Sequence, residues 1–155
     1  MQASPDQNIE SKVRSLYKTL LESWNNNKAT DFANLFANDG NVIGFDGSQM
    51  NGKKEIKDEL SKIFSDHKVG SFVGIIREFR PLSPTVFFLR AVAGMVPPGK
   101  STIKKEVNAI QTLIIQKEQE DFKIALYHNT PAAFHGRPEL SEELTRELQH
   151  EVDAN

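Results

Sequence analysis

The feature that most constrains the fold is a series of long β-type segments in the second half of the chain. Four such runs cover roughly residues 69–80, 85–96, 102–117 and 122–130. They are rich in the β-branched and aromatic residues that favour strands. The breaks between them are short and contain proline, glycine or acidic residues. Because short connections join antiparallel neighbours, the sequence predicts a meander of four strands.

The N-terminal segment predicts a long amphipathic helix. Its apolar residues recur every three or four positions, as they do on one face of an α-helix. They are Ile9, Val13, Leu16, Tyr17, Leu20, Leu21 and Trp24. Ser4, Pro5 and Gln7 supply an N-cap, a proline at the first helical position and a capping-box glutamine.

Two shorter helices and one short strand are expected before the meander. Thr30 is placed to cap a second helix that points Phe32, Leu35 and Phe36 inward and ends at residues 39–40. Residues 41–45 then read as a strand, residues 46–48 as a turn, and a third helix begins near Gly52. Its apolar positions are Ile56, Leu60, Ile63 and Phe64. Helices followed by a long meander predict an α+β half-barrel, a strongly curved antiparallel sheet with the three helices on its concave face.

The last part of the chain is a separate, acidic segment. Residues 1–135 are expected to form one domain and residues 136–155 a C-terminal tail. Apolar residues spaced by four predict an amphipathic helix over residues 138–152. They are Leu140, Leu144, Leu148 and Val152. This helix can pack on its own domain or on a partner.

Composition narrows the class of protein. A chain of 155 residues fits one domain with a sizeable core, and the absence of cysteine excludes disulfides, thiolate metal sites and cysteine nucleophiles. The start of the chain has neither the basic segment nor the apolar run of a secretory signal, and no stretch is long and apolar enough to span a bilayer. A net charge of -2 provides no basic field for nucleic acid. We therefore expect a cytoplasmic protein without nucleic-acid or membrane partners.

Five segments resemble one known superfamily and occur in its order. They are residues 21–25 (LESWN), 31–40 (DFANLFANDG), 52–56 (GKKEI), 109–113 (AIQTL) and 129–131 (NTP). Together they resemble the nuclear-transport-factor-2-like (SnoaL-like) superfamily, most closely its SgcJ/EcaC-type branch. The resemblance covers about residues 9–131. It implies a cone-shaped fold with a deep pocket at its wide end, a homodimer formed through the sheet, and the oxidoreductase label of that branch.

The best understood reaction of the superfamily, steroid isomerisation, is not expected here. An ungapped match places the isomerase's helix-1 tyrosine at Leu20, its general base at Gly44 and its oxyanion-hole acid at Gln111. Proton abstraction requires a base with a tuned pKa, which glycine cannot supply. The chain also lacks a Gly-rich dinucleotide turn after a strand, and no cofactor is identified.

The same match predicts which strand residues line the pocket. They are Phe88, Arg90 and Val92; Ala109, Gln111 and Leu113; and Leu126, His128 and Thr130, with Asp46 near the rim. Arg90 is costly to bury unless it faces a carboxylate such as Asp46 or an anionic ligand. The alternatives for Arg90 are a structural ion pair or a place on the outer face of the sheet, against a neighbouring subunit.

His128 and Asp46 are the candidate catalytic residues, because imidazole and carboxylate groups can act as acid or base. His128 can equally be a hydrogen-bonded core residue. Arg90, Gln111, Trp24 and Phe88 are the candidate substrate-binding residues, although Trp24 and Phe36 also suit a plain core. The remaining histidines have no matching carboxylate cluster, so no metal site is predicted.

Three classes of function remain open. The first is an enzyme, such as an oxidoreductase, isomerase or cyclase, that acts on a mostly apolar small molecule with an oxygenated or anionic end. The second is a noncatalytic module that binds such a ligand. The third is a dimerisation domain whose cavity is filled by its own side chains.

Overall fold

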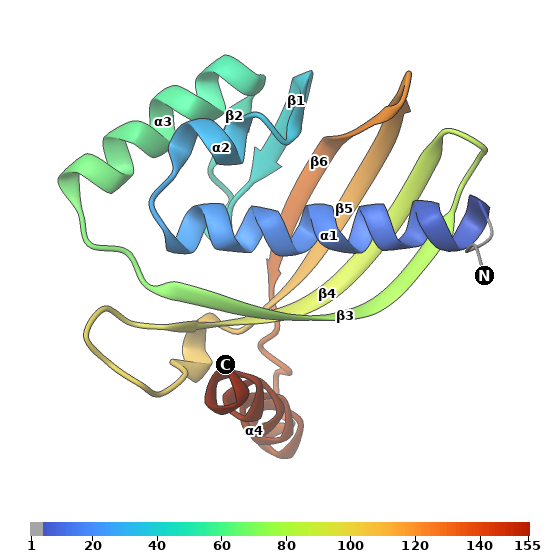
Figure 1. The fold of residues 1–155 in the computed structure, drawn as a ribbon. Helices are drawn as coiled ribbons and strands as arrows, with labels where there is room; N and C mark the ends of the chain where they lie inside the picture. Colours follow the sequence, from blue (N-terminus) through green and yellow to red (C-terminus); the bar gives the residue numbers. More distant parts are fainter. Residues whose placement is uncertain (1–4) are drawn as a thin grey trace.

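The computed structural model describes residues 5–155 and shows an α+β fold built on one curved sheet (Figure 1). Ser4, the predicted helix cap, lies outside the described residues. The helices are α1 (Pro5–Asn25), α2 (Ala29–Ala33), α3 (Lys53–Asp66) and α4 (Pro138–Ala154). The strands are β1 (Phe36–Ile43), β2 (Gln49–Asn51), β3 (Ser71–Pro81), β4 (Val86–Val96), β5 (Ala109–Glu118) and β6 (Asp121–Pro131).

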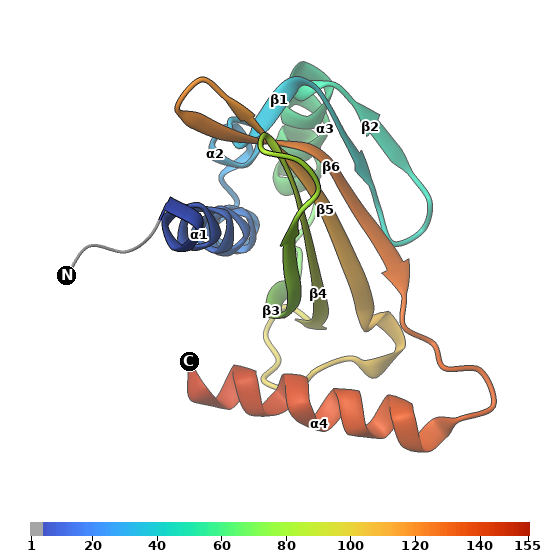
Figure 2. The ribbon, with the colours of Figure 1, turned by 90° about the vertical axis from the view of Figure 1, so that its right-hand side faces the viewer.

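The six strands follow the order β2-β1-β6-β5-β4-β3. The long strands β3 to β6 form the predicted antiparallel meander, and β1 joins its β6 side as a parallel neighbour. Helices α1, α2 and α3 lie on the concave face of the sheet, and α4 lies on the other side (Figure 2). The predicted cone-shaped half-barrel is therefore confirmed. Within residues 5–155, none of the helices combines the length and the apolar character needed to cross a membrane.

The predicted second helix is wrong in its extent. α2 ends at Ala33, and the residues after it enter β1, which begins at Phe36. Thr30 lies inside α2, and the N-cap is Lys28 without a side-chain hydrogen bond. Pairing of β1 with β6 overrides the local helical pattern here, because a strand gains its stability from its neighbours. The third predicted run is also shorter: residues 105–107 form a 3-10 turn, and β5 starts only at Ala109.

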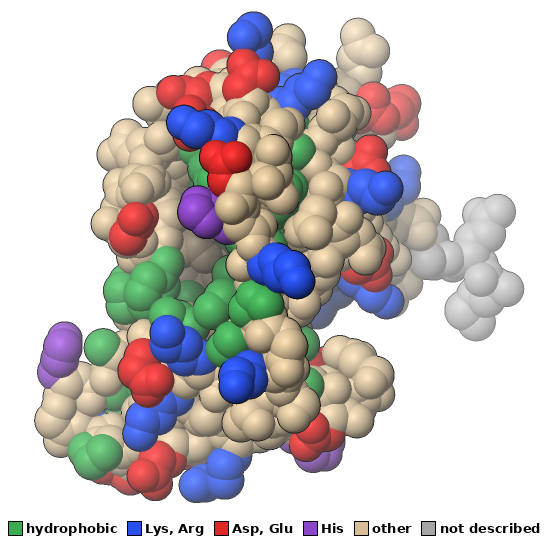
Figure 3. All heavy atoms as spheres, turned by 90° about the vertical axis from the view of Figure 1, so that its left-hand side faces the viewer, with side chains coloured by type: hydrophobic (Ala, Val, Ile, Leu, Met, Phe, Trp, Pro, Cys, Tyr) green, Lys and Arg blue, Asp and Glu red, His purple; other side chains and the backbone are tan. Residues whose placement is uncertain are grey.

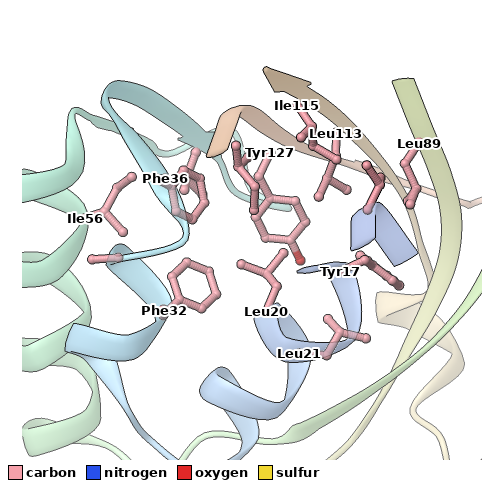
Figure 4. Packing of buried hydrophobic residues seen from close by; sticks show 14 of the residues in the cluster. Tyr17, Leu20, Leu21, Phe32, Phe36, Ile56, Leu89, Leu113, Ile115 and Tyr127 are labelled. Carbon is pink, nitrogen blue, oxygen red and sulfur yellow. The ribbon is translucent and has the colours of Figure 1, made fainter. Parts of the chain in front are cut away.

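The main core fills the space between the concave face and the N-terminal helices (Figure 4). α1 contributes Val13, Tyr17 and Leu20, all at most 2% exposed. The sheet contributes alternating residues, which on β4 are Phe87, Leu89 and Ala91. Burial of this apolar surface is the main force that holds the helices on the sheet.

The C-terminal helix packs on its own chain, against the convex side of the sheet. Leu144 and Leu148 of α4 are buried with Ile103 and Ala132. The half-buried residues around this second cluster include Val73, Ile75, Val92 and Ile110. Arg77 on β3 donates two hydrogen bonds to Glu147 of α4, at 2.5 and 2.6 Å. Both faces of the sheet are thus partly covered within one chain.

Gly74 marks the closest approach of α1 to the sheet, and its replacement tests this packing. A Cβ atom at Gly74 would lie 2.1 Å from Tyr17 Oη and 2.8 Å from Leu21 Cδ1. We expect Gly74→Ala to lower the free energy of unfolding by about 1–3 kcal/mol, because α1 must shift. Gly44→Ala is the control, since its nearest neighbour would be 3.5 Å away. Urea denaturation measures both, and equal stabilities of the two variants would contradict the packing.

Candidate ligand pocket

A cavity of about 340 Å³ opens at the wide end of the cone. Figure 3 shows hydrophobic side chains around a hollow on this side of the molecule. The walls come from α1, α2, α3, the β1–β2 hairpin, the 3-10 turn of residues 105–107 and the concave side of the sheet. Apolar residues that line the cavity include Leu21, Trp24, Phe32, Val42, Phe45, Met50, Leu60, Ile63, Phe72, Met95, Val107 and Ala109. The volume lies at the low end of the range of roughly 300–1,000 Å³ for small-molecule sites.

Trp24 is held firmly in this wall. Its indole Nε1 donates a hydrogen bond of 3.0 Å to the carbonyl of Gly70. Its ring makes edge contacts with Phe64 and Phe72, with centroids 5.2 and 5.4 Å apart. Trp24 therefore lines the cavity, and its contact with a ligand stays a prediction. It is also the single tryptophan of the chain, so the tryptophan fluorescence of the protein comes from the wall of the cavity.

The polar part of the site is a hydrogen-bonded network centred on Gln111, which is fully buried. Tyr17 Oη donates to Gln111 Oε1 at 2.6 Å. Gln111 Nε2 donates to Tyr127 Oη at 2.7 Å and to Asn129 Oδ1 at 2.9 Å. Asn129 Nδ2 in turn donates to the carbonyl of Ile43 at 3.1 Å. One carboxamide thus connects α1, β5 and β6, and through Asn129 it reaches β1.

The two phenols of this network stay protonated at neutral pH. Burial raises the pKa of Tyr17 well above its usual value, and the nearby Tyr127 raises it further. Burial also raises the pKa of Tyr127, against a smaller opposing effect of the hydrogen bond with Asn129. Figure 4 shows the Tyr127 ring reaching across the core toward α1. Tyr127 and Asn129 both line the cavity, so the network supplies its polar wall.

Asp46 lies at the mouth of the cavity, at the rim where the sequence placed it. Its Oδ1 accepts a hydrogen bond of 2.9 Å from the Ser48 backbone N–H. Hydrogen bonds from Ser48 lower the pKa of Asp46 below its ordinary value. The carboxylate therefore stabilises the turn between β1 and β2, and a carboxylate with a lowered pKa is a weak base.

Three of the predicted site residues lie on the opposite face of the sheet, so their predicted inward orientation is wrong. Phe88 and Arg90 of β4 and His128 of β6 point away from the cavity, because their neighbours Phe87, Leu89 and Tyr127 fill the concave side. The Arg90 side chain is 48% exposed, and its partner is Glu78, at 3.3 Å, and not Asp46. The same correction applies to three other residues: Val92, Leu126 and Thr130.

The structure therefore divides the predicted site. Asp46 and Trp24 line the cavity, and Gln111 lies one hydrogen bond behind its wall. Arg90, Phe88 and His128 are not part of this group. Sequence reasoning missed Tyr127 and Asn129, because a bulge in β6 makes Asn129, and not His128, the direct partner of Gln111 across the hairpin.

A phosphate-binding loop is also suggested by spacing, but the fold does not support it. Gly94, Gly99, Lys100 and Ser101 match the pattern G-x-x-x-x-G-K-S. Such a loop needs a helix directly after it, to present N–H groups to phosphate. Here the loop leads only to the 3-10 turn of residues 105–107, and the Ser101 carbonyl accepts a hydrogen bond from Gln149 of α4. Residues 5–155 also contain no group of three or more His, Asp or Glu side chains that could hold a metal ion.

Comparison with solved structures shows the fold family. No family model and no curated relative matches the sequence. A domain of unknown function with a cystatin-like fold from Nostoc punctiforme is 21% identical, covers 94% of this chain and 92% of its own, and has a TM-score of 0.77. An NTF-2-like protein of unknown function from Shewanella oneidensis is 18% identical, with coverage of 78% and 98% and a TM-score of 0.65. A ketosteroid isomerase-like protein from Erwinia carotovora is 14% identical, with coverage of 79% and 95% and a TM-score of 0.61.

The protein thus has the fold of the nuclear-transport-factor-2-like proteins, as its sequence motifs predicted. The structural similarity establishes the fold. Because the identities are low, it leaves the activity open. The SgcJ/EcaC-type branch stays a prediction from sequence.

Alkaline titration tests the buried network, because Tyr17 and Tyr127 are the only two tyrosines of the chain. In the unfolded chain both titrate near pH 10. Raised pKa values in the folded state mean that the stability contributed by these phenols is complete below about pH 10 and is lost as the pH rises further. We expect native tyrosinate absorbance to appear only well above the midpoint measured in urea. Tyr17→Phe should halve the amplitude, and a native midpoint near 10 for both phenols would contradict the network.

Proposed function

We propose that the protein binds a small, mostly apolar molecule in the cavity and holds its neutral, oxygenated end at Asn129 and Tyr127. One observation carries this proposal: an apolar cavity of about 340 Å³ has its polar atoms gathered on one wall, where Gln111 orients them. Asn129 Nδ2 donates to the Ile43 carbonyl at 3.1 Å and also interacts with the Tyr127 hydroxyl. A ligand carbonyl or ether oxygen would share these donors, by accepting from Asn129 Nδ2 or from the Tyr127 O–H.

A neutral end fits the cavity better than the anionic end that the sequence suggested. The anionic prediction rested on Arg90, which faces the other side of the sheet. Among the residues that line the cavity, the charged side chain is Asp46, and it is negative because its pKa is lowered. The carboxylate of an anionic ligand would therefore lose its hydration in the cavity without gaining a cation, which is costly.

Binding without catalysis is the function that this geometry supports best. Proton transfer requires a group with a pKa near the working pH. The pKa of Tyr127 is raised and that of Asp46 is lowered, so each moves away from neutrality. An oxidoreductase activity of the SgcJ/EcaC type remains the alternative, and it would need a redox partner in the same cavity.

We also infer a homodimer, formed through the part of the convex face that α4 leaves open. On this part Phe88, Ile114 and Leu126 stand in register on three neighbouring strands, and all three are only half buried. A second copy of the chain would cover this apolar row. A cytoplasmic location remains a prediction of the sequence alone.

Trp24 fluorescence tests ligand binding directly. The neutral dye N-phenyl-1-naphthylamine should enter the cavity and accept energy from Trp24. Ala109→Phe fills the cavity and should abolish this transfer, whereas Thr112→Phe on the opposite face of β5 should retain it. We expect the dissociation constant of 2-nonanone, measured by displacement of the dye, to be at least tenfold lower than that of nonanoate. This ratio corresponds to a difference of about 1.4 kcal/mol in binding free energy.

The Asn129→Leu variant separates recognition of the oxygen from apolar fit. It should retain dye binding and lose the preference of 2-nonanone over nonane. Absence of energy transfer in the unsubstituted protein, or equal transfer in Ala109→Phe, would contradict a ligand site in this cavity. Stronger displacement by nonanoate would contradict the neutral end.

The dimer is tested by light scattering of Ile114→Lys. A lysine at this half-buried position places a charge in the middle of the proposed interface, so the variant should be monomeric at concentrations where the unsubstituted protein is dimeric. Thr30→Lys, at an exposed position on α2, is the control and should leave the mass unchanged. A monomeric unsubstituted protein at micromolar concentration would refute the dimer.

A further inference from the structure

A second hollow lies along the free edge of the sheet and shares Leu21 and Phe72 with the wall of the cavity. It encloses about 1060 Å³ between α1, β3 and the end of α4. Figure 2 shows β3 at the border of the sheet, with α1 on one side and α4 on the other. We call it the β3 groove and define it by Glu10, Arg14, Lys18 and Glu22 of α1, residues 73–76 of β3, and Glu151 of α4.

The floor of the β3 groove is an edge strand with outward backbone groups. β3 is the last strand of the sheet and pairs only with β4. In an antiparallel pair, alternate residues direct their N–H and C=O groups away from the partner strand. Phe72 is one of these, because both of its backbone groups bond outside the ladder, to Asn25. Gly74 and Ile76 follow at intervals of two and face the groove in the same way.

Asn25 shows what kind of group fits this edge. Its Nδ2 donates to the Phe72 carbonyl at 2.9 Å, and its Oδ1 accepts from the Phe72 N–H at 2.8 Å. A carboxamide that bonds both groups of one residue imitates the peptide unit of a neighbouring strand. The positions of Gly74 and Ile76 lack such an imitation, since no described side chain hydrogen-bonds to them. The outward backbone groups of β3 are therefore hydrogen-bonded at Phe72 and remain available for pairing at Gly74 and Ile76.

The charges of the groove favour a basic occupant. Arg14 is already paired with Glu10 at 2.8 Å. Lys18 and Glu22 are exposed and opposite in charge, so Glu151 leaves the groove with one negative charge in excess. Glu151 is half buried beside β3 and forms no ion pair with a described residue. A half-buried carboxylate gains most from a cation brought by a partner. Val73 and Ile75 lie next to it and supply apolar contact for alternate side chains of an added strand.

We propose that the β3 groove binds an extended peptide segment of another protein, which adds to the six-stranded sheet as a strand beside β3 and places a lysine or arginine at Glu151. Main-chain hydrogen bonds to Gly74 and Ile76 provide attachment, and the basic residue provides selectivity. The free segment is short, because Asn25 closes one end and a bulge after Ile76 closes the other. The proposed contacts at Gly74, Ile76 and Glu151 are not part of the ligand cavity, although Leu21 and Phe72 line both hollows.

The test uses fluorescein-labelled, N-acetylated peptides of alternating threonine and valine with one lysine, measured by anisotropy on the whole protein. Single N-methyl groups in the peptide remove one N–H donor at a time and leave the protein unchanged. Strand addition predicts that N-methylation weakens binding at least tenfold at alternate positions and has little effect between them. In ¹⁵N NMR spectra the amides of Gly74 and Ile76 should shift on binding. Weakening without a two-residue period, or unshifted amides, would overturn the proposal.

Two protein variants complete the experiment. Glu151→Lys should reverse the preference, so that a peptide with glutamate in place of lysine binds better, whereas Glu143→Lys, at an exposed position on α4, should not. Ile76→Pro removes one outward N–H and should reduce binding without breaking a bond to β4. A different result would also overturn the proposal: the protein binds no peptide, and Ile76→Pro dissociates its dimer. That result would show that β3 pairs with a second copy of the chain.

Discussion

The structure depends on the carboxamide of Gln111. It is fully buried, and its oxygen and both N–H groups are used, by Tyr17, Tyr127 and Asn129. Loss of one of these partners would leave a polar group of the buried amide without a hydrogen bond, which is costly, so each partner stabilises the network. Because its members come from α1, β5 and β6, the network fixes where the long helix lies over the sheet. The same bonds aim Tyr127 and Asn129 at the cavity, which joins folding to the proposed binding.

The second constraint is that both faces of the sheet carry apolar residues. On β4 the inward set is Phe87, Leu89 and Ala91, and the outward residues Phe88 and Val92 are also apolar. α4 covers part of the convex face, and a second copy is proposed to cover the rest. Arg90 and Glu78 lie at 3.3 Å on this convex side, with side chains 48% and 32% exposed. An ion pair this exposed contributes little stability.

These two constraints explain what the sequence could predict. The half-barrel followed from the period change between the helical half and the long strands. The resemblance to the superfamily placed Gln111 correctly on the inward face of β5, together with Ala109 and Leu113. His128 was placed on the wrong face because β6 carries a bulge: Ile114 pairs with Leu126 but Ile115 pairs with Ile124. The extra residue reverses the alternation after Ile124, and nothing in the local sequence announces it. For β4, apolar residues on both faces left the register undetermined.

A double-mutant cycle on Tyr17 and Gln111 tests the central claim most directly. Gln111→Met keeps the length of the side chain and removes its hydrogen bonds, so the free energy of unfolding should fall by about 1–3 kcal/mol. In the Tyr17→Phe background the same change should cost less, with a coupling of about 0.5–3 kcal/mol measured by urea denaturation. Strictly additive effects, or a Gln111→Met variant as stable as the unsubstituted protein, would show that the carboxamide does not hold α1 on the sheet.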